Sequence, residues 1–176
     1  MRKPMAAIAG CLALFPGVAN AAQPACLTKA EFSSLSAYAL PSVISGTSKR
    51  CTQTLPASAY LPSSGQALVA RYAARKSDSW PQAKTAFFKF GRSRGDKTVD
   101  MMAKMPDDSL REVVDVTIEG LVSQEIPLER CGTIDDAVRL LSPLPPENMA
   151  GLIGLIVSLA AKDTDEKPGK LSICRG

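Results

Sequence analysis

Apolar positions recur at helical spacing along most of the chain. In the segment 109–124 they return every three or four residues, which places them on one face of an α-helix, while acidic residues fall on the opposite side. We therefore predict a helix over 109–124 with one face in the core and an acidic face in water. The predicted core face comprises Leu110, Val113, Val114, Thr117, Ile118 and Leu121, and the acidic face comprises Asp108, Glu112, Asp115 and Glu119.

Local start and stop signals place the other helices. Thr28 with Glu31 three residues later forms a capping box, which predicts a helix over 29–44 that Pro41 should bend or break. Because no segment alternates between apolar and polar residues with period two, we predict an all-α fold of six to seven helices in one domain. The remaining predicted helices cover 63–76, 79–90, 98–104, 133–141 and 147–162.

The segment 147–162 is apolar almost all round its predicted helix. A helix of this kind is typically buried at the centre of a fold. It is shorter than the ~20 apolar residues that cross a membrane. We therefore predict a central core helix and no transmembrane span in the mature chain.

The first 21 residues have the layout of a secretory signal. Two basic residues are followed by an apolar run over 5–15 and by Ala19-Asn20-Ala21, an A-x-A cleavage site. We expect cleavage after Ala21 and a periplasmic or secreted protein. A lipoprotein signal ending at Cys11 is the alternative, but its apolar run would be shorter than the usual minimum of about 7 residues.

Cleavage would leave a helical domain over 22–162 and a polar tail over 163–176, anchored by Cys174. Four cysteines would remain, and an even number in an oxidising compartment predicts two disulfides. Four cysteines allow three pairings. The helices predicted over 133–141 and 147–162 would form an antiparallel hairpin, which brings the chain after residue 162 back toward Cys131. This favours a Cys131–Cys174 disulfide and leaves Cys26 to pair with Cys51. Because zinc sites usually contain closely spaced cysteine pairs, which are absent here, we expect no metal and no other cofactor.

The chain contains no histidine. This excludes Ser-His-Asp and Cys-His catalysis, so the G-x-S-x-G sequence over Gly91–Gly95 lacks the base that a nucleophilic serine needs. Glycoside hydrolysis requires only two carboxylates, and Asp107-Asp108 and Asp135-Asp136 are acidic pairs. Both pairs fall at predicted helix starts, where acids stabilise the helix dipole. We therefore predict a protein that is not an enzyme, with a carboxylate-dependent hydrolase as the alternative.

Charge is divided between two halves of the chain. Residues 22–97 carry 11 basic against 3 acidic residues, and residues 98–176 carry 8 against 14. Most aromatic residues lie in the basic half, an arrangement that could bind an anionic polymer or membrane surface through residues 71–97. The favoured alternative is that the two halves pair their charges and bury the aromatics. The candidate anion-binding residues are Arg71, Arg75, Lys84, Phe88, Lys89, Arg92 and Arg94, with Phe88 expected to be exposed.

Short sequence elements follow one another along the mature chain: Cys26-Leu-Thr-Lys-Ala-Glu31, Ala39-Leu-Pro41, Cys51, Leu55-Pro56, Trp80-Pro81 with Ala83, Cys131, Leu144-Pro-Pro-Glu-Asn148 and Ile173-Cys174. Their order resembles a group of uncharacterised small exported four-cysteine proteins of Gram-negative alphaproteobacteria. The resemblance implies an envelope location and brings no catalytic residues with it. We expect an exported, non-catalytic binding or accessory protein, whose partner would be an envelope protein or an anionic polymer rather than nucleic acid.

Overall fold

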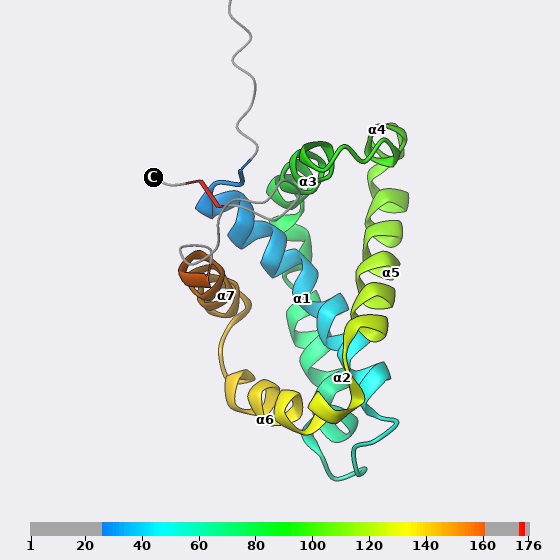
Figure 1. Cartoon of the computed structure of the whole chain (residues 1–176), viewed down its shortest axis with the longest axis vertical. Coiled ribbons are helices and arrows are strands. Elements are labelled where there is room, and N and C mark those ends of the chain that lie inside the picture. Colours follow the sequence, from blue (N-terminus) through cyan, green and yellow to red (C-terminus); the bar gives the residue numbers. More distant parts are fainter. Residues whose placement is uncertain (1–25, 161–172, 175–176) are drawn as a thin grey trace, which may run out of the picture.

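The described part of the chain is helical throughout. The computed structural model describes residues 26–160 and 173–174; the expected signal (1–21) and most of the expected tail (163–176) lie outside the described residues. No strand occurs in this part beyond one parallel bridge between Leu27 and Ile173, so the prediction of an all-α fold with six to seven helices is confirmed. The elements, shown in Figure 1, are α1 (Lys29–Cys51), α2 (Tyr60–Ala73), α3 (Lys76–Ser93), α4 (Thr98–Met102), α5 (Asp107–Glu125), the 3-10 turn η1 (Leu128–Arg130), α6 (Cys131–Leu141) and α7 (Pro146–Ala160).

Helix α1 begins at the predicted capping box and is longer than predicted. The Glu31 N–H donates to the Thr28 hydroxyl at 3.1 Å, and the Thr28 N–H donates to the Glu31 carboxylate at 2.7 Å. The helix then continues past Pro41 to Cys51, so the predicted end at residue 44 is wrong. Pro41 is buried inside it. Packing of α1 against α2, α3, α5 and α7 stabilises a helix that local propensity alone would have ended.

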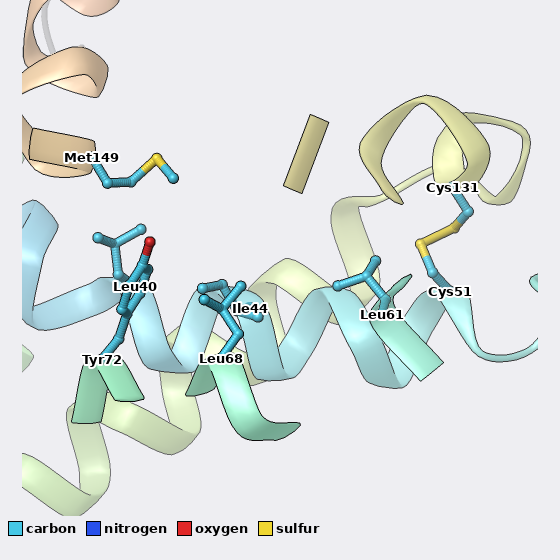
Figure 2. Close-up of a cluster of buried hydrophobic side chains, with 8 residues drawn as sticks. All are labelled: Leu40, Ile44, Cys51, Leu61, Leu68, Tyr72, Cys131 and Met149. Atoms are coloured by element: carbon cyan, nitrogen blue, oxygen red, sulfur yellow. A yellow bond between two sulfur atoms is a disulfide. The ribbon is translucent and has the colours of Figure 1, made fainter. Parts of the chain in front are cut away.

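Two large hydrophobic clusters and a smaller one around Phe32 lie along α1. The first joins α1 to α2, α6 and α7 around Leu40 and Ile44, and Figure 2 shows the Cys51–Cys131 disulfide at one end of it. The second joins α1 to α3, α4 and α5 around Tyr38 and Trp80, whose ring centroids are 4.8 Å apart. Helix α1, rather than α7, is therefore the central element of the fold (Figure 1).

The two disulfides are present, but the predicted pairing is wrong. Cys26 is bonded to Cys174 and Cys51 to Cys131, with Cα–Cα distances of 5.0 and 5.3 Å. An unbroken α1 of 23 residues is about 34 Å long, which holds Cys26 and Cys51 at opposite ends. Cys131, at the start of α6, lies beside the end of α1. The Cys174 N–H donates to the Leu27 carbonyl at 2.8 Å, beside the start of α1.

Helix α5 is turned relative to the predicted orientation. Leu110 and Val114 are fully buried as expected, but Leu121 is 56% exposed. The predicted acidic face is partly directed inward, because Asp115 binds Lys76 of α3 and Glu119 binds Lys49 of α1. Asp115 and Glu119 thus occupy part of the inner face of α5 through ion pairs with α3 and α1. Some apolar residues of α5, such as Leu121, face water instead.

Helix α7 lies at the periphery, so the prediction of a central core helix is wrong. Its inner side carries the buried Met149 and Ala150 and packs mainly against α1. Its outer side is apolar too, with Ile156 57% and Leu159 53% exposed. No helix within residues 26–160 is long and apolar enough to cross a membrane.

The crossing of α1 and α5 is close because of a glycine. A Cβ added to Gly46 would lie 2.5 Å from the backbone carbonyl oxygen of Glu119. That atom belongs to the α5 backbone, which cannot move away as a flexible side chain could. The close approach also brings α1 and α5 near enough for the Lys49–Glu119 ion pair.

We expect Gly46→Ala to lower the free energy of unfolding by about 1–3 kcal/mol, because the methyl group overpacks the α1–α5 crossing. Gly120→Ala on α5 is the control, since a Cβ there meets no atom within 4 Å. That variant should stabilise the protein by up to about 1 kcal/mol through helix propensity. Urea unfolding followed by circular dichroism measures both changes, and equal effects of the two substitutions would contradict the prediction.

Candidate functional site

The cations of the candidate anion-binding segment mostly point toward acidic residues of other elements. Lys89 binds Glu31 at 2.9 Å, and Arg75 binds Glu147 at 3.1 Å. Arg92 binds Asp100 at 3.2 Å. These ion pairs neutralise three of the cations that lie close together in the sequence.

The other three candidate cations also have described contacts. Lys84 binds Asp107 of α5, and Arg71 donates to the Ser142 carbonyl. The Arg94 guanidinium lies 5.4 Å from the centre of the Phe90 ring. The contacts of the six cations therefore lie on α1, α3, α4, α5, α7 and the end of α6, and the cations do not converge on one site.

Phe88 is buried, so its expected exposure is wrong. Only 8% of the residue is exposed, and it belongs to the cluster that contains Trp80 and Val99. Helix α3 packs against α1 and also contacts α4, whose Val99 belongs to the same buried cluster as Phe88. The Arg92 guanidinium lies 5.7 Å from the centre of the Phe88 ring. The phenyl ring is therefore a core group.

A part-buried ion pair joins three helices that are distant in the sequence. Asp115 of α5 accepts from the Lys76 ammonium of α3 and, at 3.2 Å, from the Ser42 hydroxyl of α1. The Lys76 ammonium also lies 4.4 Å from the centre of the Tyr38 ring, a cation–π contact. Burial, with a smaller contribution from the Asp115 charge, raises the pKa of Tyr38 well above its usual range. The phenol therefore stays protonated near neutral pH.

A second polar group surrounds Trp80, the single tryptophan of the chain. Its indole N–H donates to Asp107 at 3.0 Å, and the Arg111 guanidinium lies 5.2 Å from the centre of the ring. Hydrogen bonds from Lys84 and then Trp80 hold the pKa of Asp107 below its usual range. A catalytic acid would need the opposite shift. Two donors of α3 contact the Asp107 carboxylate, and its lowered pKa therefore disfavours a role as a general acid.

The other acidic pair is divided between two structural roles. Asp135 is buried and accepts from the N–H groups of Tyr60 and Leu61 at 3.1 and 2.6 Å, so it caps α2 from the distant helix α6. Asp136 instead pairs with Arg139 one turn along α6. The predicted start of α2 at Ser63 is wrong, because a side chain 75 residues away caps the helix at Tyr60. The sequence near α2 contains no signal for this cap.

The G-x-S-x-G sequence lies at the end of α3. The Ser93 hydroxyl donates to the Phe90 carbonyl at 2.7 Å, as a side chain in the last turn of a helix commonly does. No strand precedes it, which a nucleophile elbow requires. Among the residues that the structure describes, no group of three or more cysteine or acidic side chains could hold a metal ion.

Acid should weaken the Lys89–Glu31 contact. Burial opposes ionisation of Glu31, but hydrogen bonds from Thr28 and Lys89 outweigh it and hold the pKa of this carboxyl below its usual value. A lowered folded-state pKa stabilises the protein above the unfolded-state value, near 4.3, and this contribution is lost as the pH falls through the folded-state pKa.

We therefore expect Lys89→Met to flatten the fall in unfolding free energy between about pH 5 and pH 3. Lys104→Met is the control, since Lys104 is exposed and binds no acidic residue among those described. Urea unfolding at several pH values measures the slope. A wild-type slope in Lys89→Met would contradict the assignment of this acid sensitivity to the Glu31 pair.

Comparison with known proteins identifies no relative. No protein-family model, no curated protein and no solved structure matches the chain.

Proposed function

We propose that the chain is exported and acts in the cell envelope as a non-catalytic helical protein that binds a protein partner. The observation that carries this proposal is a contrast between polar and apolar groups. Of the two acidic pairs considered for catalysis, Asp107 and Asp135 accept hydrogen bonds from neighbouring elements and Asp136 pairs with Arg139. Asp108 is exposed at the start of α5, where the other carboxylate of its pair is already hydrogen-bonded. Apolar residues on the outer surface of α5 are instead more than half exposed, including Val116 and Leu121. Exposed apolar surface commonly marks a binding face.

Export is supported by the two disulfides and by the signal-like residues 1–21. Disulfides form and persist in oxidising compartments and are rare in reducing ones. The Cys51–Cys131 bridge is almost completely buried, as expected of a structural rather than a reactive pair. The alternatives, a carboxylate-dependent hydrolase and an anion binder acting through residues 71–97, lack a supporting observation of this kind in the described residues.

Fractionation of a Gram-negative host expressing the full chain tests the location. We expect the protein in the osmotic-shock fraction, beginning at Ala22, with both disulfides formed. A variant lacking residues 2–21 is the control and should remain in the cytoplasm. A full-length chain found only in the cytoplasm would contradict export.

Incubation of the purified mature protein with isolated envelope glycan tests the absence of catalysis. We expect no release of reducing sugar ends. Release by the wild type that Asp107→Asn or Asp135→Asn abolishes, while each variant keeps the wild-type circular dichroism spectrum, would favour the hydrolase instead.

A further inference from the structure

The outer surface of α5 carries an apolar stripe. Val113, Val116 and Leu121 are 39%, 67% and 56% exposed, and Thr117 lies between them at helical spacing. A Cβ on Gly120, in the same stripe, would meet no atom within 4 Å. From Val113 to Leu121 the stripe is about 12 Å long. We call these five residues the α5 outer face.

The α5 outer face points away from the rest of the described helices. Helix α5 packs mainly against α1, through Leu110, Val114 and the inward-facing acids Asp115 and Glu119. In the view of Figure 1, α5 lies at one edge of the molecule, on the opposite side of α1 from α7. The apolar stripe is thus on the side of α5 that no described helix covers.

The border of this stripe is acidic. Asp108, Glu112 and Glu125 are exposed and form no ion pair with a described residue. Glu112 lies four residues before Val116, and Glu125 lies four residues after Leu121, so both are neighbours of the stripe on the helix surface. Arg111, the single basic residue of α5, is directed toward Trp80. The outer side of α5 therefore combines exposed apolar groups with uncompensated negative charge.

We propose that the α5 outer face binds an amphipathic helix of a partner protein, one whose apolar stripe is flanked by lysine or arginine residues. This inference rests on the proposed binding function and names the surface and the chemistry of the partner. The apolar residues would be removed from water between the two helices, and the small residue at Gly120 would allow close approach. Basic flanks would pair with Glu112 and Glu125, and such charge complementarity favours both association rate and partner choice.

The same charges disfavour a second copy of this chain at this surface. Two α5 helices packed antiparallel would bring Asp108 and Glu112 of one copy toward Glu125 of the other. Two packed in parallel would place each acid beside its own counterpart. Like charges across an interface are destabilising, so a basic helix fits the surface better than α5 itself.

Binding of a helical peptide of lysine and leucine, as long as α5 and with its leucines on one face, tests the proposal. Fluorescence anisotropy with the purified mature protein measures its affinity, and the same peptide with glutamate in place of lysine is the comparison. We expect the lysine peptide alone to bind, more weakly as salt is raised. We expect Val116→Arg with Leu121→Arg to weaken binding by about tenfold or more.

Leu140→Arg on α6 is the matched control, because Leu140 is 68% exposed and lies outside the α5 outer face. It should bind the lysine peptide as the wild type does. Failure of the lysine peptide to bind, equal binding of both peptides, or equal loss in the α5 and α6 variants would overturn the proposal. Sedimentation of the wild type as a dimer that the α5 variant abolishes would assign the face to a second copy and also overturn it.

The binding assay does not depend on the cellular location of the protein. If the protein binds the peptide but fractionation finds it in the cytoplasm, the proposal for the α5 outer face is supported and the envelope function is overturned. An exported chain that does not bind the peptide would leave the envelope function standing and overturn this surface.

Discussion

Replacing Cys51 and Cys131 together by alanine should lower the free energy of unfolding by about 4–5 kcal/mol. The bridge closes a loop with a sequence separation of 80, and the entropy that it removes from the unfolded chain corresponds to about 4.5 kcal/mol. Both cysteines are essentially fully buried in the cluster shown in Figure 2, so the lost sulfur atoms also reduce packing between the end of α1 and the start of α6. Urea unfolding of the purified protein measures the change.

The Cys26→Ala, Cys174→Ala variant provides the comparison. Its bridge spans a sequence separation of 148, so loop entropy alone would predict a slightly larger effect. Cys26 and Cys174 are, however, only partly buried and lie outside the helices, so removal frees chain in the folded state as well. We expect a smaller loss than for the Cys51–Cys131 pair. An equal or greater loss would show that the inner bridge is not the principal covalent restraint.

Trp80→Ala should be the most damaging single substitution at the α1–α3–α5 junction. Truncation of a buried tryptophan typically costs about 3–5 kcal/mol. Trp80 is only 2% exposed, contacts Tyr38 and donates to Asp107. The substitution also removes the ring beneath Arg111, whose Nε is already buried without a hydrogen-bond partner in the described structure. Loss of helical circular dichroism in urea measures the effect, because the variant lacks the fluorescent residue.

Trp80→Phe separates the ring from its N–H group. It retains an aromatic side chain beside Tyr38 and loses the hydrogen bond to Asp107. We expect this loss to lower the free energy of unfolding by about 1–2 kcal/mol. It should therefore be clearly more stable than Trp80→Ala. Similar stability of the two variants would mean that the hydrogen bond, rather than packing of the ring, accounts for most of the contribution of Trp80.

Features determined by neighbouring residues were predictable from the sequence. The Thr28–Glu31 capping box lies where its residues indicate, since both partners are within one helical turn. The existence of α5 and α7 follows from apolar periodicity and length. The burial of Leu110 and Val114 was predictable too. The inward orientation of Asp115 was not, because its partner Lys76 is 39 residues away in the sequence.

The candidate site shows the same limit. The charge division between the halves of the chain was visible in composition, and Lys84–Asp107 and Arg75–Glu147 now join those halves. Composition could not show which cations remain available, since pairing depends on how α3 packs against α5 and α7. The cap on α2 was invisible for the same reason, because Asp135 reaches Tyr60 only after α6 has folded beside α2.

The nesting of one disulfide inside the other determines what a protease could release from the protein. The Cys51–Cys131 bridge is nested inside the Cys26–Cys174 bridge, so every described helix lies within one covalent ring. A single cut between Cys26 and Cys51, or between Cys131 and Cys174, leaves the two pieces joined by the outer bridge. A cut between Cys51 and Cys131 leaves them joined by both. The fragments of a singly cleaved molecule would therefore stay covalently linked until the disulfides are reduced. A partner bound to α5 would remain attached to both fragments.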